Sequence, residues 1–431
     1  MTMAKRCLFI CYGYPPSSTP GAVRVSRIVK RLPLQGWQPL VMTAGEQGLM
    51  RSSGLADPLA GEPGSVIRVA DPLAGAVKAA GGSVNVVGQS PTLAVRLART
   101  VLFPDRSAPW AMRLRLARDA VRKAAPDVVV STAPTLSTHL AARGLARAAG
   151  VPWIAEFRDP VSWLPEQDET GPWRRRALAA IERWVVENAD ATVTISEAFS
   201  EYFRSLYPAA RIHTVPNGID FRPEAIEAAL AARAARLAAK RPGDPLVLVH
   251  AGALYNGARE PGPLIAAAKR AAEGSARPIR LRFIGPDSHL AGKAAAELGA
   301  SDLVEVVGAM DHAATVRETE QADVVVALLH RDPVARIGIM SKFFDYAATG
   351  NPVLVVGERE AMLSRIVEDE GAGAAFAYDD TAGLAAWIGR TAADPAGFSC
   401  DTLALAGNWS ADSMARQMAA VLDQVVARQR G

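Results

Sequence analysis

The chain has 431 residues, of which 49% are hydrophobic and 21% charged; this composition is typical of folded domains and excludes global disorder. The length is enough for two domains of ordinary size. Apolar runs such as 324–329 are far shorter than the roughly 20 residues needed to cross a bilayer. The run after Lys5 and Arg6 ends at Tyr14 and lacks a cleavage site, so it predicts a first strand rather than a signal peptide.

The cysteine content of the sequence indicates a cellular compartment, and the distribution of charge indicates the kind of partner. Cys7, Cys11 and Cys400 form neither a metal-ligand cluster nor a disulfide framework in the sequence, which is typical of a cytoplasmic protein. The net charge of +4 is uneven, because residues 1–205 carry 25 Lys and Arg against 17 Asp and Glu, whereas residues 206–431 have a net charge of −4. A basic first half indicates an anionic partner: nucleic acid, a phosphorylated lipid or an acidic membrane surface.

Short runs of β-branched residues alternate with longer Ala- and Arg-rich segments of helical period. This alternation predicts an α/β protein with buried parallel strands between layers of helices. The predicted strands of the first half are 7–12, 39–43, 128–131, 153–156, 192–195 and 212–215. Those of the second half are 246–251, 281–284, 304–307, 324–329 and 353–356. The Gly- and Pro-rich segment 45–95 is predicted to be a variable loop region.

The two series of strands predict two doubly wound, Rossmann-like domains that face each other across a cleft. We expect the first domain to span residues 1–205 and the second residues 206–410, with a C-terminal helix at about 411–431 packing back on the first domain. Between them, Pro216-Asn217-Gly218 makes a turn and 223–240 reads as an Ala-rich helix. Ligands of such domains bind beyond the carboxyl ends of the strands.

The loop after the first predicted strand opens a helix whose apolar residues recur on one face (Val25, Ile28, Val29 and Leu32). Gly21, at the start of this helix, would let backbone N–H groups approach an anion. Arg24 lies in the first turn, where the helix dipole disfavours a cation. Both are candidate donor-binding residues; the alternative is a structural glycine beside a solvated arginine.

Two later strand ends of the first half also carry polar residues. His139, on the helix after strand 128–131, is a candidate acceptor-side residue, although a lone histidine near a helix start is more often structural. Strand 153–156 is followed by Arg158 and Asp159. This pair is either a structural ion pair or places a guanidinium and a carboxylate in the cleft as candidate catalytic groups.

The second half contains the stronger candidates. Gly252 opens a strand-end loop that leads to Arg259, a combination suited to a diphosphate. Ser341 is predicted to cap a helix; Lys342 lies in its first turn, where an anion would have to neutralise it, and Asp345 lies three residues on. Cations for phosphates and an acid for ribose hydroxyls match a nucleoside diphosphate. The alternative is a capped surface helix with a local Lys–Asp pair.

In their order and spacing, these motifs resemble the bacterial family-4 glycosyltransferases of GT-B fold, especially members with a family-4-like N-terminal domain. The resemblance covers nearly the whole chain. It rests on segments 21–24, 157–160, 193–197, 215–220, 252–259 and 342–352. It implies transfer of a sugar from a nucleotide donor with retention of configuration, without a cofactor and without a metal. The lack of an Asp-x-Asp triplet in the sequence agrees with a metal-free reaction.

The resemblance also implies individual roles. Arg259 stands at the family's phosphate-binding basic position, normally lysine, and Asp345 at the second acid of the paired-glutamate motif, which holds the donor ribose. Gly21 would lie beneath the donor diphosphate, and Arg158 and Asp159, where many relatives carry a histidine, would face the reacting sugar and acceptor.

Two departures from the family pattern keep other functions open. Ile337 replaces the first acid of the paired motif, and Ala253 replaces a basic residue next to Gly252. One alternative is a catalytically silent nucleotide-sugar-binding partner subunit; the other is an enzyme similar to the nucleotide-sugar 2-epimerases, whose acid/base pattern we do not find.

The acceptor is indicated by basic residues interspersed with tryptophan. Eight of them lie within residues 96–123: Arg96, Arg99, Arg106, Arg113, Arg115, Arg118, Arg122 and Lys123. Trp110 interrupts this run, and Trp173, Arg174–Arg176 and Trp184 form a second cluster. These features fit an anionic membrane surface or solvated helix faces; no motif for nucleic acid accompanies them. On the membrane reading, the acceptor is a lipid-linked glycan of bacterial surface polysaccharide synthesis, at the inner face of the cell membrane.

Overall fold

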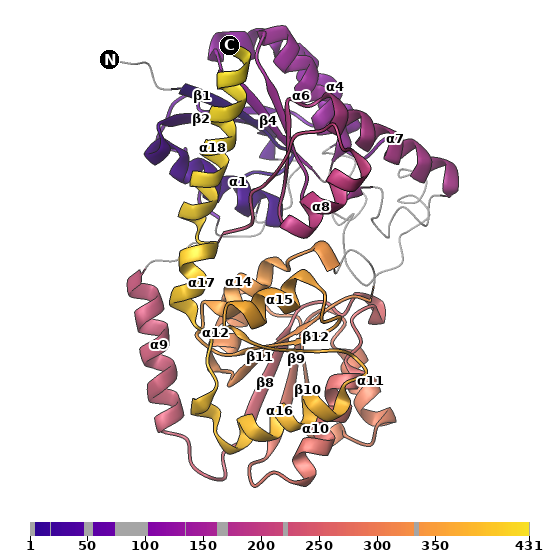
Figure 1. Cartoon of the computed structure of the whole chain (residues 1–431), viewed down its shortest axis with the longest axis vertical. Helices are drawn as coiled ribbons and strands as arrows, with labels where there is room; N and C mark the ends of the chain where they lie inside the picture. The colour runs from indigo at the N-terminus through magenta and orange to yellow at the C-terminus, as the bar shows by residue number, and fades with distance from the viewer. Residues whose placement is uncertain are drawn as a thin grey trace. The chain divides into compact units, whose positions relative to one another are not determined.

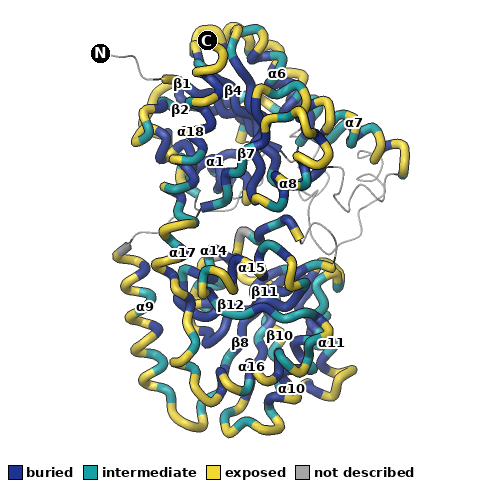
Figure 2. Tube along the Cα trace, in the orientation of Figure 1, coloured by how far each residue is buried: buried dark blue, intermediate teal, exposed yellow. Residues whose placement is uncertain are grey.

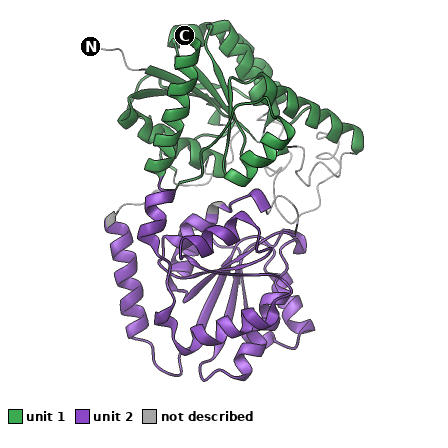
Figure 3. Cartoon of the chain, in the orientation of Figure 1, with its two compact units in different colours: residues 1–86, 90–220, 411–431 green, residues 87–89, 221–410 purple. Residues whose placement is uncertain are grey.

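The computed structural model describes residues 5–17, 19–46, 55–73, 102–133, 135–161, 171–218, 223–331 and 336–430. These residues divide into two compact units (Figure 3). The first unit contains the described residues within 1–86, 90–220 and 411–431, and the second contains those within 221–410. Among the described helices, none is long and apolar enough to cross a membrane.

The first unit is built on a parallel sheet of seven strands in the order β3-β2-β1-β4-β5-β6-β7. Figure 1 labels β1, β2 and β4 of this sheet. The strands are β1 (Lys5–Ile10), β2 (Trp37–Ala44), β3 (Val66–Val69), β4 (Val128–Thr132), β5 (Trp153–Glu156), β6 (Ala191–Thr194) and β7 (Ile212–Thr214). The chain winds outward from β1 to β3 and returns to β4 on the other side of β1. Ligands of such sheets bind beyond the carboxyl ends of the strands where the winding reverses, here β1 and β4.

Helices cover both faces of this sheet. α1 (Pro20–Arg31), η1 (Leu32–Gln35) and α18 (Ala411–Arg430) pack together, and α1 and α18 share a core with strand residues such as Val130 and Ile154. Neighbouring strand residues point to the opposite face, where α6 (Leu136–Ala149) packs with α4 (Ala108–Leu114), α5 (Arg118–Ala124) and α7 (Pro172–Asn188). η3 (Arg115–Ala117) joins α4 to α5, and α8 (Glu197–Leu206) contacts β6 and β7. Most residues of the strands are buried, whereas the outer helix faces are exposed (Figure 2).

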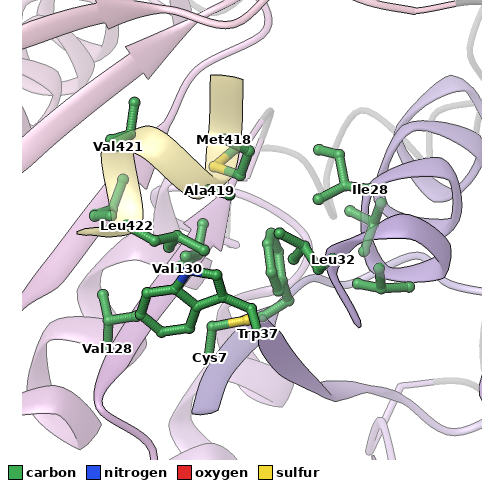
Figure 4. Packing of buried hydrophobic residues seen from close by; sticks show 14 of the residues in the cluster. Cys7, Ile28, Leu32, Trp37, Val128, Val130, Met418, Ala419, Val421 and Leu422 are labelled. Atoms are coloured by element: carbon green, nitrogen blue, oxygen red, sulfur yellow. The ribbon is translucent and has the colours of Figure 1, made fainter. Parts of the chain in front are cut away.

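Helix α18 brings the end of the chain back to the first unit. Met414, Met418 and Leu422 are buried in one cluster with Trp37 and Val128. Figure 4 shows Met418 and Leu422 of α18 in this cluster, together with Trp37 and Val128. Since burying one aliphatic side chain contributes about 1.5–3 kcal/mol, α18 is a structural part of this unit.

The second unit has a parallel sheet of six strands in the order β10-β9-β8-β11-β12-β13. The strands are β8 (Leu246–Ala251), β9 (Ile279–Ile284), β10 (Val304–Gly308), β11 (Val324–Leu328), β12 (Val353–Val356) and β13 (Gly373–Phe376). Helices α10 (Gly262–Glu273), α11 (His289–Glu297) and α16 (Thr381–Ala393) share a core with the strands. The other described elements are α9 (Pro223–Ala238), η6 (Tyr255–Gly257), η7 (Ser301–Leu303), α12 (His312–Gln321), α14 (Ser341–Ala347), α15 (Met362–Asp369), η8 (Pro395–Gly397) and α17 (Thr402–Trp409). Here the winding reverses between β8 and β11.

The predicted class of two doubly wound α/β domains is confirmed, and the eleven predicted strands are present with ends shifted by at most two residues. The prediction misses β3 and β13, which are short, partly exposed edge strands with a weak hydrophobic signal. β3 lies within segment 45–95, predicted as loop; the structure describes 45, 46 and 55–73 of that segment.

The boundary between the units also differs from the predicted one at 205/206. The described residues of 206–220 belong to the first unit. The reason is that β7 pairs with β6, with Ile212 opposite Thr192, so the sheet continues beyond residue 205. The Ala-rich helix predicted at 223–240 is α9, which ends at Ala238.

The buried guanidinium of Arg24 joins α1 to the end of β5. Its Nε and Nη2 atoms both donate to Oε1 of Glu156, at 3.0 and 2.8 Å. Its remaining N–H groups donate to the carbonyl oxygens of Val215 (2.7 Å) and Pro216 (3.1 Å) and to Oδ1 of Asn217 (2.9 Å). An arginine has five N–H donors, so a contact between Arg24 and a sugar donor would require one of these bonds to break.

We predict that Arg24→Met lowers the free energy of unfolding of the first unit by about 3–5 kcal/mol, because it leaves the Glu156 carboxylate buried without its cation. Chemical denaturation would measure this change. Asp423→Asn is the control: it removes the exposed Lys5–Asp423 ion pair of the same unit, with an expected cost below about 1 kcal/mol. Equal losses in the two variants would contradict the prediction, and the double variant Arg24→Met/Glu156→Leu should recover stability.

Candidate functional site

Three basic side chains converge on Gly252, the first residue after β8. A Cβ atom at this glycine would lie 3.3 Å from Nζ of Lys342, 3.7 Å from Nε2 of His250 and 3.9 Å from Nη1 of Arg259. The backbone at Gly252 therefore passes directly beneath nitrogens from β8, from the following loop and from α14. Of these, Gly252, Arg259 and Lys342 were predicted from the sequence, and the structure brings them together.

Arg259 is held by the loop that precedes it. Its guanidinium lies 4.6 Å from the centre of the Tyr255 ring, and Nη1 donates to the carbonyl oxygen of Ala253 at 3.4 Å. Its Nε atom is buried and, among the described residues, has no hydrogen-bond partner. Burial lowers the pKa of this guanidinium, so an approaching anion would meet a cation that is already partly desolvated.

The shape of this loop depends on residues after β9 that sequence reasoning missed. The Asp287 carboxylate accepts hydrogen bonds from the backbone N–H groups of Leu254 (2.8 Å) and Asn256 (3.3 Å). Gly285 lies against the carbonyl oxygen of Gly252, where a side chain would collide with the backbone. An Asp and a Gly just after a buried strand are the only sequence signal for this support.

Lys342 and Asp345 lie together on α14. Nζ of Lys342 donates to the carbonyl oxygen of Ala251 at 3.1 Å, and the Tyr346 hydroxyl donates to the same oxygen at 2.6 Å. Although much of Lys342 is exposed, partial burial of its ammonium and the charge of Arg259 lower its pKa, while Asp345 opposes the shift. The electrostatic proximity of Lys342 and Asp345 agrees with their predicted place on one helix.

The start of α14 differs from the prediction. The helix begins at Ser341 and Met340 takes the N-cap position, so Ser341 is not the cap. Ile337, which replaces an acid of the family pattern, is buried.

His250 was not singled out from the sequence, because it sits inside a strand pattern that reads as core. It is buried on β8, with its Nδ1 atom 3.0 Å from the carbonyl oxygen of Val326 and its ring 5.8 Å from that of Phe283. Burial, together with the charges of Arg259 and Lys342, lowers its pKa to about 3. The ring is therefore neutral at pH 7.

In the first unit, Gly21 and Arg158 are in direct contact. The guanidinium of Arg158 occupies the space that a side chain at Gly21 would need, and its Nε donates to the carbonyl oxygen of Ala133. Burial lowers the pKa of Arg158 and raises that of Asp159, and the charge of each opposes the shift of the other. A side chain at position 21 would displace this guanidinium from its present place.

His139 lies near Arg158 and is fully buried. Its Nδ1 atom is 2.7 Å from Oγ of Ser131, which also accepts a hydrogen bond from Nε1 of Trp153 at 2.7 Å. Burial and the charge of Arg158 lower the pKa of His139 to about 3. In this geometry His139 is a neutral ring in the core beside a predicted site residue.

The basic segments divide into exposed and buried members. Trp110 is fully buried and donates to the carbonyl oxygen of Val69 at 3.1 Å, so its expected place on a membrane-facing surface is wrong. Arg174 is also buried and donates to the carbonyl oxygens of Leu102 and Pro104. Arg96 and Arg99 lie outside the described residues.

Across the described ranges, no three His, Cys, Asp or Glu side chains are grouped so that they could hold a metal ion.

The chain is similar to one protein family by sequence and to solved structures by fold. Residues 21–218 match the family described as "Glycosyl transferase 4-like domain". No curated protein matches the sequence.

The structural relatives cover almost all of this chain at low identity. Sucrose-phosphate synthase from Thermosynechococcus elongatus is 16% identical, with a TM-score of 0.62 over 98% of this chain and 100% of that chain. HepE from Anabaena, solved in complex with UDP, is 14% identical, with a TM-score of 0.59 over 97% and 100%. WaaG, a glycosyltransferase involved in lipopolysaccharide biosynthesis, is 15% identical, with a TM-score of 0.54 over 99% and 100%. At such identities the likeness establishes the fold.

We predict that His139 and His250 remain neutral from about pH 5 to 8, because burial lowers the pKa of both rings to about 3. The pH dependence of the side-chain NMR signals of the six histidines would measure their protonation. The variants His139→Gln and His250→Gln would assign the signals of these two rings. Because their native pKa lies below the 6.5 of an unfolded chain, the unfolded state binds the extra protons, and stability falls as the pH drops below about 6.5. A resonance of either ring that titrates near 6.5 would contradict the assignment.

Proposed function

We propose that this chain is a glycosyltransferase of the family-4 type that transfers a sugar from a nucleoside-diphosphate donor to a glycan with retention of configuration. The proposal is supported by the match of residues 21–218 to the glycosyl transferase 4-like family and by the fold shared with glycosyltransferases of known structure. The observation that carries the proposal is the convergence of Lys342 and Arg259 on Gly252. Two cations above a backbone without a side chain form a receptor for a diphosphate.

The proposed mechanism follows from the charge of the leaving group. As the bond between the sugar and the diphosphate breaks, negative charge grows on the β-phosphate. Arg259 and Lys342 are already in place and partly desolvated, so they can stabilise this charge without reorganisation. Asp345, on the same helix as Lys342, would accept hydrogen bonds from the ribose. In this proposed mechanism Arg259 and Lys342 supply the positive charge, and no step uses a metal or a cofactor.

The first unit would bind the acceptor. Arg158 and Asp159 follow β5, and their shifted pKa values mark them as candidate catalytic groups. His139 would act from the acceptor side through its neighbour Arg158, since its own ring is buried. The resemblance to family-4 enzymes implies that Gly21 would lie beneath the donor diphosphate; within this unit it packs against the same guanidinium.

A silent nucleotide-sugar-binding subunit is the second candidate function. It is favoured by Ile337, whose buried aliphatic side chain cannot accept a hydrogen bond from a donor sugar. Such a subunit would bind the donor and neither hydrolyse nor transfer its sugar, whereas a 2-epimerase-like enzyme would convert the donor without an acceptor. UDP-sugars are the first donors to test, because the structural relative HepE was solved with UDP.

We predict that Arg259→Met lowers the rate of sugar transfer at least about 100-fold, the effect of removing one donor that stabilises transition-state charge. The measurement is turnover of a panel of nucleotide sugars with lipid-linked and free glycan acceptors. Arg270→Met is the control, since Arg270 is an exposed arginine of the same unit and its replacement should leave the rate unchanged. Near-wild-type turnover by the folded Arg259→Met variant would refute the role of Arg259.

We further propose that the first unit binds an anionic membrane surface on the cytoplasmic side through a patch on α4, η3 and α5. This basic-apolar patch consists of Met112, Arg113, Arg115, Leu116 and Arg118. Leu116 is 86% exposed and Met112 is 65% exposed, an arrangement in which apolar side chains can enter the headgroup region while the arginines contact anionic lipids. A lipid-linked acceptor would then be reached at the membrane surface.

We predict that the protein sediments with liposomes containing anionic lipid and stays in the supernatant with neutral ones, and that salt weakens the binding. Met112→Ser/Leu116→Ser should lower the bound fraction several-fold, because it removes the apolar contribution. Leu34→Ser is the matched control, since Leu34 is an equally exposed leucine of the same unit (79%) on η1. Equal recovery with both liposome types would exclude the patch as a membrane site.

A further inference from the structure

The buried imidazole of His250 has one nitrogen bonded and one nitrogen without a partner. Nδ1 lies 3.0 Å from the Val326 carbonyl oxygen; because a carbonyl can only accept, Nδ1 must carry the hydrogen. In a neutral ring, Nε2 is then a hydrogen-bond acceptor. This atom is buried, and no described residue is hydrogen-bonded to it. A buried acceptor left without a donor costs free energy, so its persistence beside a candidate binding site calls for a functional explanation.

The ammonium of Lys342 is a source of a donor on the same side of Gly252. Nζ of Lys342 and Nε2 of His250 lie 3.3 and 3.7 Å from one common point, the missing Cβ position of Gly252. An ammonium has three N–H donors, and the structure shows one of them used, toward the carbonyl oxygen of Ala251 at 3.1 Å. The lysine side chain is flexible, so a movement of its end can bring a second N–H to Nε2.

We infer that His250 is a positioning residue for the phosphate-binding lysine: in the loaded site its neutral Nε2 accepts a hydrogen bond from Lys342, so that the third N–H of the ammonium points at the diphosphate. This inference rests on the proposed function, since it assigns a role within the same donor site. Fixing two of three ammonium donors to the protein leaves one direction for the anion, and this pre-organisation lowers the entropic cost of binding.

The charges around His250 support a neutral acceptor. Arg259 and Lys342 disfavour a proton on the ring, as does burial, whereas Asp287 and the Val326 carbonyl favour one. The balance keeps Nε2 unprotonated at pH 7. A protonated imidazole would instead repel the Lys342 ammonium and could not accept its N–H.

The experiment compares His250→Gln with His250→Met by calorimetric binding of UDP and of inorganic pyrophosphate. The two replacements have nearly the same length and shape, and both lose the bond to Val326, so that loss cancels in the comparison. Glutamine still offers an oxygen to Lys342, whereas methionine does not. We expect His250→Met to weaken binding about tenfold, as for loss of one hydrogen bond to a charged group, and His250→Gln to stay within about threefold of wild type.

The same pair in a Lys342→Met background separates positioning from a merely structural role. If His250 acts through Lys342, the difference between glutamine and methionine disappears there; thermal unfolding of each variant checks that the fold is intact. Equal losses for both replacements, or a difference that persists without Lys342, would overturn the inference while leaving the donor site in place. Failure of the wild-type protein to bind either probe would overturn the proposed function and, with it, the inference.

Discussion

Arg259 and Lys342 place two positive charges beside Gly252, just after β8. Burial lowers the pKa of both side chains, and the charge of Arg259 lowers that of Lys342 further. Like charges in a partly desolvated environment repel, so other interactions in the fold must hold Arg259 and Lys342 close together. The support comes from hydrogen bonds and packing: the Ala251 carbonyl for Lys342, the Tyr255 ring for Arg259 and the Asp287 carboxylate for the loop between them. An anion bound above Gly252 would relieve the repulsion, and the functional assignments of the second unit all follow from this electrostatic imbalance.

In the first unit, buried interactions hold polar groups in place at the carboxyl ends of the strands. Arg24 and Glu156 form a buried ion pair. Other N–H groups of Arg24 donate to the carbonyl oxygens of Val215 and Pro216. The C-terminal helix α18 packs against the same side of the sheet as α1, so the end of the chain stabilises the helix that carries Gly21 and Arg24. With these elements fixed, the Arg158 guanidinium can pack directly on Gly21.

Much of the candidate site could be predicted, because several of its residues stand at positions that their residue type ordinarily avoids in helices and loops. Lys342 near a helix start, and Gly252 and Arg259 beyond a buried strand, are unusual in ways that indicate an anion. Arg24 was selected by the same argument. The unfavourable position of its charge at a helix start is offset by its ion pair with Glu156, 132 positions away in sequence. His250 and Asp287 could not be selected, because a histidine within an apolar run and an aspartate in a turn each have ordinary explanations. Their significance lies in which atoms they approach.

The sequence by itself determined the two series of buried strands, their order along the chain and the loops that lie at strand ends, since these follow from hydrophobic period and from breakers that act over a few residues. Only the tertiary structure decided that β7 extends the first sheet, that Trp110 is a core residue rather than a surface one, and that His250, Lys342 and Arg259 meet at Gly252. The physical reason is that pairing across a sheet, burial and electrostatic shifts of pKa depend on distances between residues that are remote in sequence. No local pattern encodes those distances.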